Sequence, residues 1–242
     1  MRQFLLLLFM LCFAAPAAAS PVIPAQSTQM ILVRSADWQA PKGTLQRYER
    51  TVRGWQPVGA PWAIVLGRNG LGWGSGLVPA PGGGEPSKRE GDGRSPAGIY
   101  PLETAYGYAK MPPAGSRWFY KAIGEQDRCV DDAKAPQYNQ IVTISPEQPE
   151  VWQSAEVMKR PDDLYRWLIV VAHNQNPPIP GQGSCIFLHV WRSDSSPTAG
   201  CTAMAQQRLE SLLRWLRPEA KPVLVQLPES TYRTMRKSWK LP

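Results

Sequence analysis

The sequence predicts a mainly β protein with a few helices, arranged as one β-sandwich-like or barrel-like core. Short apolar runs, several of them alternating with polar residues, recur along the chain. The 25 prolines and 20 glycines indicate many turns between them. One stretch alone carries a long apolar stripe at helical spacing. With 242 residues, the chain is long enough to bury a sizeable core.

Seven of the apolar runs have the length and composition of strands. They cover residues 30–33, 44–55, 62–66, 140–144, 168–172, 186–191 and 223–227.

The clearest predicted helix covers residues 202–216, and a shorter one covers 230–239. Four leucines of the longer segment are spaced i, i+3, i+4 and i+7, so they fall on one helical face: Leu209, Leu212, Leu213 and Leu216. Pro218 follows and ends the helix.

The N-terminus predicts a secretory signal peptide over residues 1–19. Arg2 precedes an apolar run, and Ala17 and Ala19 form a small-residue cleavage site before Ser20. The run is too short to span a bilayer. A buried N-terminal helix and an uncleaved anchor are the alternatives. We therefore expect a periplasmic or cell-envelope protein.

The chain is basic, with a formal net charge of +8 that falls by one when Arg2 is removed. A basic surface on an exported protein fits anionic envelope polymers or lipid headgroups. No nucleic-acid-binding motif is present, so no nucleic-acid partner is expected. No second apolar stretch has the length of a membrane span.

The cysteines provide the first functional signal. Cys12 leaves with the signal peptide, so Cys129, Cys185 and Cys201 remain, an odd number in an oxidising compartment. The simplest arrangement is one disulfide and one free thiol. Nucleophilic catalysis would explain why a thiol is kept free.

Cys201 is the candidate nucleophile because Gly200 and Cys201 directly precede the predicted helix 202–216. Free amides and the helix dipole at that point would lower the thiol pKa and hold an oxyanion. Gly200 would leave the backbone bare for a substrate carbonyl. His189, at a predicted strand end one loop away, is the candidate general base.

Other arrangements of the same residues remain open. Cys201 would be inert if it were buried or bridged to Cys185. A pairing of Cys129 with Cys185 is favoured, because Cys185 lies four residues, at roughly 3.3 Å each, from the histidine end of its strand. His173 either lines the same cleft or is structural. A zinc site formed by both histidines with Cys185 and Cys201 is a further alternative, although its spacing matches no zinc motif.

Residues 79–98 are rich in glycine, proline and charge, and predict a loop. They match neither a phosphate-binding loop nor a dinucleotide fingerprint. The loop is either a solvated surface segment or a wall of an active site.

The histidine–cysteine constellation resembles the L,D-transpeptidase catalytic domain, the YkuD-like family. That family carries a histidine, a loop and then [Ser/Thr]-x-Gly-Cys, which here is His189 followed by residues 198–201. It also carries an upstream Thr/Ser-Pro-x-Gly-x-aromatic segment, which here is residues 95–100. The family is exported in bacteria. The resemblance covers roughly residues 60–227.

The sequence resembles a divergent branch of that family still more closely. Features of the branch are residues 88–93, residues 129–132 with Tyr138 and Asn139, and residues 187–189. Three features depart from the main pattern: a short loop between His189 and Cys201, Ala199 where a second histidine is common, and residues 202–204 without the frequent Arg or Asn.

The resemblance implies a β-sandwich-like catalytic domain that acts on peptidoglycan stem peptides. Cys201 would attack the diaminopimelate carbonyl of a tetrapeptide stem, expelling D-Ala, and His189 would take the thiol proton. The backbone carbonyl of Val190 would orient the imidazole, while Gly200 and Thr198 would shape the oxyanion site and the cleft. An amine of a neighbouring stem would resolve the thioester. Carbapenems acylate enzymes of this family.

Further expectations concern substrate contacts and organisation. Arg192, Lys88 or Arg89 would meet stem carboxylates, and His173 would contact the substrate. No cofactor or metal is implied, and a monomer is expected. Residues 20–59 would form N-terminal strands leading into the core. Residues 60–242 would form the catalytic domain with a C-terminal helical segment.

Two other functions use the same features. A hydrolase, such as an L,D-carboxypeptidase, amidase or endopeptidase, would resolve the same thioester with water. A non-catalytic cell-wall-binding module would need no free thiol.

Overall fold

The computed structural model describes residues 22–147 and 149–242. The predicted signal peptide therefore lies outside the described residues. Within this part of the chain, no helix is long and apolar enough to cross a membrane.

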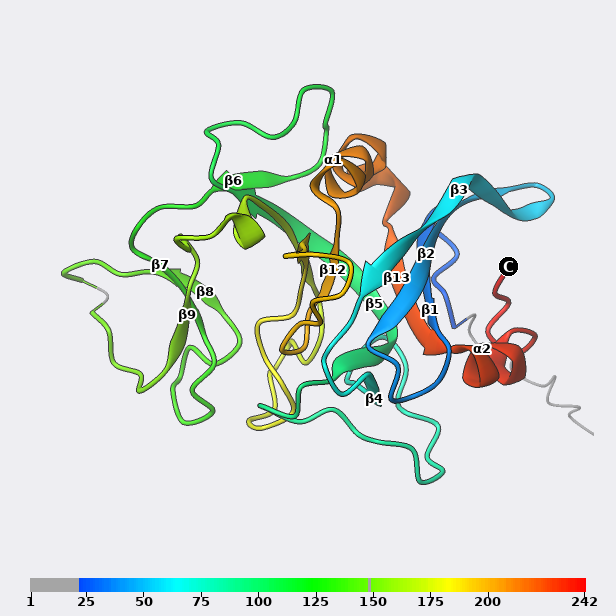
Figure 1. Cartoon of the computed structure of the whole chain (residues 1–242), viewed down its shortest axis with the longest axis horizontal. Helices are drawn as coiled ribbons and strands as arrows, with labels where there is room; N and C mark the ends of the chain where they lie inside the picture. Colours follow the sequence, from blue (N-terminus) through cyan, green and yellow to red (C-terminus); the bar gives the residue numbers. More distant parts are fainter. Residues whose placement is uncertain (1–21, 148) are drawn as a thin grey trace, which may run out of the picture.

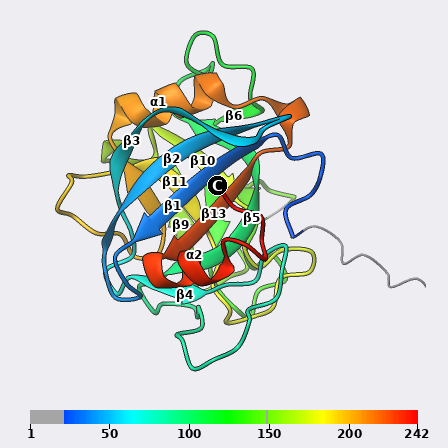
Figure 2. The same cartoon turned by 90° about the vertical axis from the view of Figure 1, so that its right-hand side faces the viewer.

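The main feature of the fold is a sheet that closes on itself. Its strands run in the order β10-β11-β12-β3-β2-β1-β13-β5, and β5 pairs back with β10 to complete the ring. Figures 1 and 2 show these strands wrapping around a common centre. The members are β1 (Gln29–Ser35), β2 (Lys42–Thr51), β3 (Gly54–Val65), β5 (Ser95–Gly107), β10 (Trp167–Val171), β11 (Phe187–Val190), β12 (Thr202–Met204) and β13 (Val223–Pro228). The predicted mainly β, barrel-like core is confirmed.

Most neighbouring strands are antiparallel, but β1 pairs with β13, and β11 with β12, in parallel. Two short strands, β4 (Leu71–Trp73) and β6 (Tyr120–Ala122), add to β5 in parallel. Two neighbouring parallel strands need a crossover connection. Between β11 and β12, this connection is the loop between His189 and Cys201.

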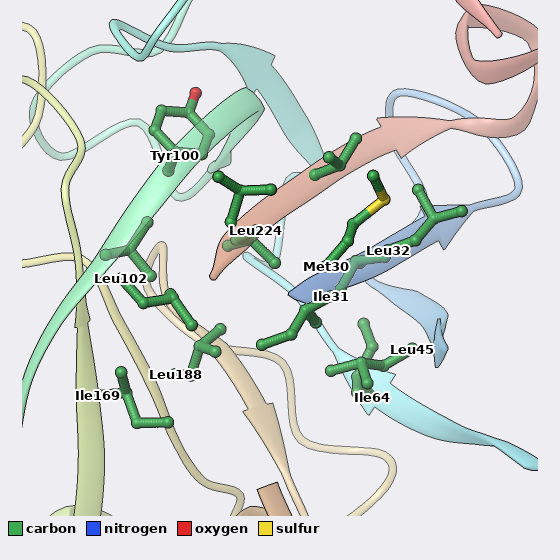
Figure 3. Packing of buried hydrophobic residues seen from close by; sticks show 14 of the residues in the cluster. Met30, Ile31, Leu32, Leu45, Ile64, Tyr100, Leu102, Ile169, Leu188 and Leu224 are labelled. Atoms are coloured by element: carbon green, nitrogen blue, oxygen red, sulfur yellow. The ribbon is translucent and has the colours of Figure 1, made fainter. Parts of the chain in front are cut away.

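The barrel interior is apolar. Figure 3 shows side chains of the apolar core, which lie on both faces of the barrel strands: Met30, Ile31, Leu32, Leu45, Ile64, Tyr100, Leu102, Ile169, Leu188 and Leu224. Their burial removes apolar surface from water and supplies the main stabilisation of the fold.

Two helices cover the outer faces of the barrel. Helix α1 (Gln206–Trp215) packs on β10 and β11, and α2 (Glu229–Met235) packs on β1 and β13. The leucine stripe of α1 is buried, as its spacing predicted. Figure 2 shows α1 at one end of the barrel and α2 lower, in front of β13.

A smaller sheet lies beside the barrel (Figure 1). It contains β7 (Asp127–Val130), β8 (Ile141–Thr143) and β9 (Ala155–Val157), in the order β8-β7-β9. Two short 3₁₀ helices complete the elements: η1 (Asp163–Tyr165) and η2 (Pro218–Ala220). A disulfide between Cys129 and Cys185 ties β7 to the segment that precedes β11, and it is the pairing favoured from the sequence.

Four predicted segments differ from the structure. The shorter helix, predicted over residues 230–239, ends at Met235. Residues 44–55 are not one strand, because β2 ends at Thr51 and a tight turn leads into β3. Residues 202–216 are not one helix, because residues 202–204 form β12 and α1 begins only at Gln206. The loop 79–98 ends earlier than predicted, because β5 starts at Ser95.

Candidate active site

Cys201 lies at the end of the β11–β12 crossover, directly before β12, and not at a helix N-terminus as predicted. In the parallel register, Leu188 pairs with Thr202 and His189 with Ala203. Cys201 is therefore opposite Phe187, and the two-residue period of strands puts Cys201 and His189 on one face of the strand pair. The alignment of two strands, and not a helix, brings the candidate nucleophile and base together.

The thiol of Cys201 is free and buried, with 7% of the residue exposed. The backbone N–H of Phe187 donates to Sγ at 3.3 Å, and the thiol is 3.5 Å from the carbonyl oxygen of Cys185, to which it donates. Because Cys185 is bridged to Cys129, it has no thiolate to offer a metal. The four-ligand zinc arrangement is therefore wrong. No cluster of potential metal ligands occurs among the residues described by the structure.

The environment of Cys201 favours the protonated thiol. Burial raises the thiol pKa well above its usual range, and the nearby carboxylate of Glu156 raises it further. The Phe187 amide and the cations Lys88 and Arg160 oppose this effect only in part. The predicted lowering of the thiol pKa is therefore wrong, because Cys201 has no helix dipole behind it and lies in an apolar cluster.

His189 is also neutral. Its Nδ1 lies 2.8 Å from the carbonyl oxygen of Val190. Since a carbonyl can only accept, Nδ1 carries the proton and Nε2 keeps its lone pair. Burial lowers the pKa of His189 to about 4, partly opposed by this hydrogen bond. At neutral pH the imidazole is an uncharged base.

Two hydroxyl groups fix the backbone at the nucleophile. The carbonyl oxygen of Cys201 accepts from Ser95 Oγ at 2.8 Å and from Thr198 Oγ1 at 2.6 Å. Thr198 Oγ1 also accepts from the N–H of Gly200 at 3.1 Å. The Ser-Pro-x-Gly and Thr-x-Gly-Cys segments, far apart in sequence, thus meet at one carbonyl.

A cavity of about 470 Å³ opens beside the thiol. Its wall includes Cys201, His189 and the backbone of the crossover. Six charged residues contribute to the lining: Lys88, Glu90, Asp131, Glu156, Arg160 and Arg192. The two signs of charge lie in one cavity, so it can receive a ligand that carries both an ammonium and a carboxylate group.

The structure brings most of the predicted residues to this cavity. Gly200, Thr198, Arg192 and Lys88 line it together with the Cys–His pair. Arg192 is largely exposed and lies 3.6 Å from a carboxylate oxygen of Asp162.

Lys88 contrasts with Arg192 because it is buried. Its Nζ lies 2.8 Å from Asp92 Oδ1 and also donates to the carbonyl of Arg89. The predicted loop therefore supplies one wall of the candidate site through Lys88. Arg89 lines a different cavity.

His173 does not line the cavity that Cys201 faces. It is 1% exposed, its Nε2 lies 3.0 Å from the carbonyl oxygen of Gln182, and its ring packs edge-on against Tyr100. These contacts fit its structural interpretation better than substrate contact.

The lining also includes residues that were not singled out from the sequence, among them Glu156, Arg160 and Tyr165. These three come from β9, the following loop and η1. Arg160 makes two hydrogen bonds to Asp162, at 2.8 and 3.0 Å, and Asp162 also caps η1. No sequence spacing links these residues to Cys201, so only the folded chain identifies them.

The branch-specific motifs form a support behind the site. Glu90 Oε2 accepts from Tyr138 at 2.6 Å and from Ser184 at 2.7 Å. Asn139 accepts from the N–H of Cys185 at 2.9 Å and donates to the carbonyl of His173 at 2.9 Å. The disulfide segment next to the thiol is thereby fixed on two sides.

A free thiol and a neutral imidazole on one strand pair, open to a cavity, are the arrangement of a cysteine acyl-transfer enzyme. The family model of the L,D-transpeptidase catalytic domain (YkuD) matches residues 39–225, most of the chain. The protein therefore belongs to the L,D-transpeptidase catalytic-domain family, whose enzymes act on peptidoglycan. The match begins earlier than the resemblance seen in the sequence, in agreement with β2 and β3 being part of the barrel. No curated protein and no solved structure matched the chain.

Proposed function

We propose that the protein is an exported L,D-transpeptidase that crosslinks or remodels peptidoglycan. The observation that carries the proposal is the shared face of Cys201 and His189 at the cavity, with the imidazole tautomer set by the Val190 carbonyl. This tautomer leaves Nε2 free to take the thiol proton.

Because both groups are neutral at rest, the reaction starts by general-base catalysis and not from a preformed ion pair. Nε2 of His189 removes the thiol proton as Sγ of Cys201 attacks the diaminopimelate carbonyl of a tetrapeptide stem. The tetrahedral intermediate collapses to a thioester. D-Ala then leaves as an amine after receiving the proton from His189.

The second half of the reaction regenerates the enzyme. An amine of a neighbouring stem attacks the thioester and loses a proton through His189, and Sγ leaves as the thiol. The product is a new peptide bond between stems. In the resting structure the thiol donates to Cys185 instead, and such catalytic contacts often tighten only when substrate binds.

The charged lining of the cavity suits the proposed donor. A diaminopimelate residue carries a free ammonium and a free carboxylate at the end of its side chain, away from the scissile carbonyl. Lys88, Arg160 and Arg192 can meet the carboxylate. Thr198 and Ser95 hold the nucleophile's backbone in place while the substrate approaches.

A purified disaccharide-tetrapeptide is the substrate for a direct test, with mass spectrometry of the products. The proposal predicts released D-Ala and a crosslinked dimer with a 3–3 bond, both absent with Cys201→Ala. Tripeptide stems without dimers would support the hydrolase alternative. Wall binding without either product, unchanged in Cys201→Ala, would support the non-catalytic alternative.

A further inference from the structure

The imidazole of His189 packs against Tyr165, a residue that no sequence pattern singled out. The ring centroids of His189 and Tyr165 are 5.4 Å apart with an interplanar angle of 76°. Tyr165 makes a second edge-to-face contact with Phe187, at 5.5 Å. The imidazole also has backbone hydrogen-bond interactions with Val190 and Leu164. The edge-to-face contact further restricts rotation of the ring.

Tyr165 is itself held from two sides. Its hydroxyl donates to Glu156 Oε2, and the guanidinium of Arg160 lies 5.2 Å from its ring centroid. Arg160 is fixed in turn by Asp162, which caps the 3₁₀ helix that carries Tyr165. Tyr165 is 5% exposed, so little solvent competes for its contacts.

We propose that Glu156 and Tyr165 form a positioning pair for the acid–base machinery: the carboxylate holds the tyrosine, and the tyrosine fixes the imidazole of His189 beside the Cys201 thiol. The inference deepens the proposed function, because it assumes that His189 is the base. It assigns a role to the small sheet and η1, which the Cys–His pair alone does not use.

The Glu156–Tyr165 pair also places the negative charge of Glu156 near the Cys201 thiol. Glu156 faces the Cys201 thiol and disfavours its thiolate, whereas Lys88 and Arg160 favour it. Asp162 acts on His189 in the direction of a higher pKa, opposing Arg160.

The pKa of Glu156 is itself raised, first by burial and then by the nearby Asp131 and Glu90, and lowered by the Tyr165 hydroxyl. Because the charge of Glu156 raises the thiol pKa, replacing its carboxylate by a neutral amide should lower that pKa. Cys201 should then carry more thiolate at any given pH.

Four variants separate the contributions. Glu156→Gln removes the charge but can still accept from the tyrosine hydroxyl, whereas Glu156→Ala removes both. Tyr165→Phe keeps the ring, and Tyr165→Leu removes it. Tyr120→Phe is the matched control, because its hydroxyl bonds the carbonyl of Ala109 outside the cavity.

Two rates are measured for each variant: iodoacetamide alkylation of Cys201 as a function of pH, and acylation by a carbapenem followed by intact mass. For Glu156→Gln, we expect the alkylation profile to move to lower pH. For Tyr165→Leu and Glu156→Ala, we expect acylation to fall by about tenfold or more, and Tyr165→Phe to fall less. A purely structural role would lower the unfolding temperature without moving the pH profile.

The inference is overturned if Glu156→Gln leaves the alkylation profile in place and Tyr165→Phe and Tyr165→Leu are acylated at the wild-type rate. If Tyr165→Leu does not fold, Glu156→Gln and Tyr165→Phe decide through the same two readouts. A wild-type protein that is neither acylated nor able to form products would contradict the proposed function instead. The alkylation profiles would then still decide whether the pair acts on the thiol.

Discussion

The hydroxyl of Ser95 donates a hydrogen bond of 2.8 Å to the backbone carbonyl of Cys201, across 106 positions of the sequence. The same hydroxyl accepts from the N–H of Gly67 at 2.8 Å. Ser95 is 0% exposed, so water does not replace these two hydrogen bonds when its hydroxyl is removed. This serine fixes the start of β5 to the nucleophile.

Replacement of Ser95 by alanine should therefore affect stability and reactivity together. The N–H of Gly67 loses its partner, which costs about 1–3 kcal/mol of unfolding free energy, whereas the Cys201 carbonyl keeps its hydrogen bond from Thr198. Denaturant unfolding measures the loss. Ser195→Ala, at an exposed position of the crossover, is the control and should change little. Equal stability of the two variants would contradict the role of Ser95.

Thr198 should matter through its hydroxyl and not through its methyl group. Thr198→Ser keeps the hydrogen bonds to the Cys201 carbonyl and the Gly200 N–H, whereas Thr198→Val removes both. We expect carbapenem acylation to fall on the order of tenfold in Thr198→Val. Thr198→Ser should stay near the wild-type rate. The opposite order would show that shape, and not hydrogen bonding, decides.

The two buried histidines predict a loss of stability in mild acid. Burial lowers the pKa of both His173 and His189 to about 4, while an unfolded histidine titrates near its ordinary value. As pH falls through that ordinary value, the unfolded chain binds protons that the folded chain does not, so the unfolding free energy decreases. From about pH 7 to about pH 5.5, each histidine should cost about 1 kcal/mol.

Denaturant unfolding of wild type and His189→Asn at both pH values isolates the contribution of one histidine. The wild type should lose about 1 kcal/mol more than the variant. If both proteins lose the same amount, His189 is not held neutral in the folded state.

The Cys129–Cys185 disulfide should stabilise the fold and the nucleophile's surroundings. It closes a loop over a sequence separation of 56, for which chain entropy predicts about 4 kcal/mol. The Cys185 carbonyl oxygen also accepts a hydrogen bond from the Cys201 thiol. We expect the double variant Cys129→Ser/Cys185→Ser to unfold at lower denaturant concentration and to be acylated more slowly.

Peptide mapping under non-reducing conditions should show the Cys129–Cys185 bridge and a free Cys201 thiol. A bridge that includes Cys201 would contradict the assignment.

Sequence patterns predicted the strands whose apolar residues form unbroken or alternating runs, such as β1, β10 and β13. They missed β5, the longest strand, because Pro96, Gly98 and Pro101 carry turn signals. In the structure, Gly98 has a φ of 143°, and a Cβ atom at this position would lie only 2.7 Å from the Tyr100 hydroxyl. The glycine therefore allows close packing inside a strand.

The prediction that the helix begins at residue 202 is wrong for a related reason. Helical periodicity identified the leucine stripe, but it does not locate the first helical residue. Residues 202–204 gain ladder hydrogen bonds with β11 and bury all three side chains, which outweighs any helical preference.

The candidate nucleophile and base were identifiable because they lie close together in the chain and match a family pattern. Glu156 and Tyr165 were not, because they reach the cavity from a separate sheet and a short 3₁₀ helix. Their role depends on a hydrogen bond and a ring contact that only tertiary structure creates.

The proposed mechanism requires that Cys201 forms a covalent thioester-type intermediate with His189 as its base. Intact-mass analysis after incubation with a carbapenem detects such an intermediate, with Cys201→Ala and His189→Ala alongside. We expect one adduct per chain in the wild type, mapped to the peptide that contains Cys201, much slower adduct formation in His189→Ala, and none in Cys201→Ala. A folded wild-type protein that forms no adduct, or an adduct that persists in Cys201→Ala, would contradict this mechanism.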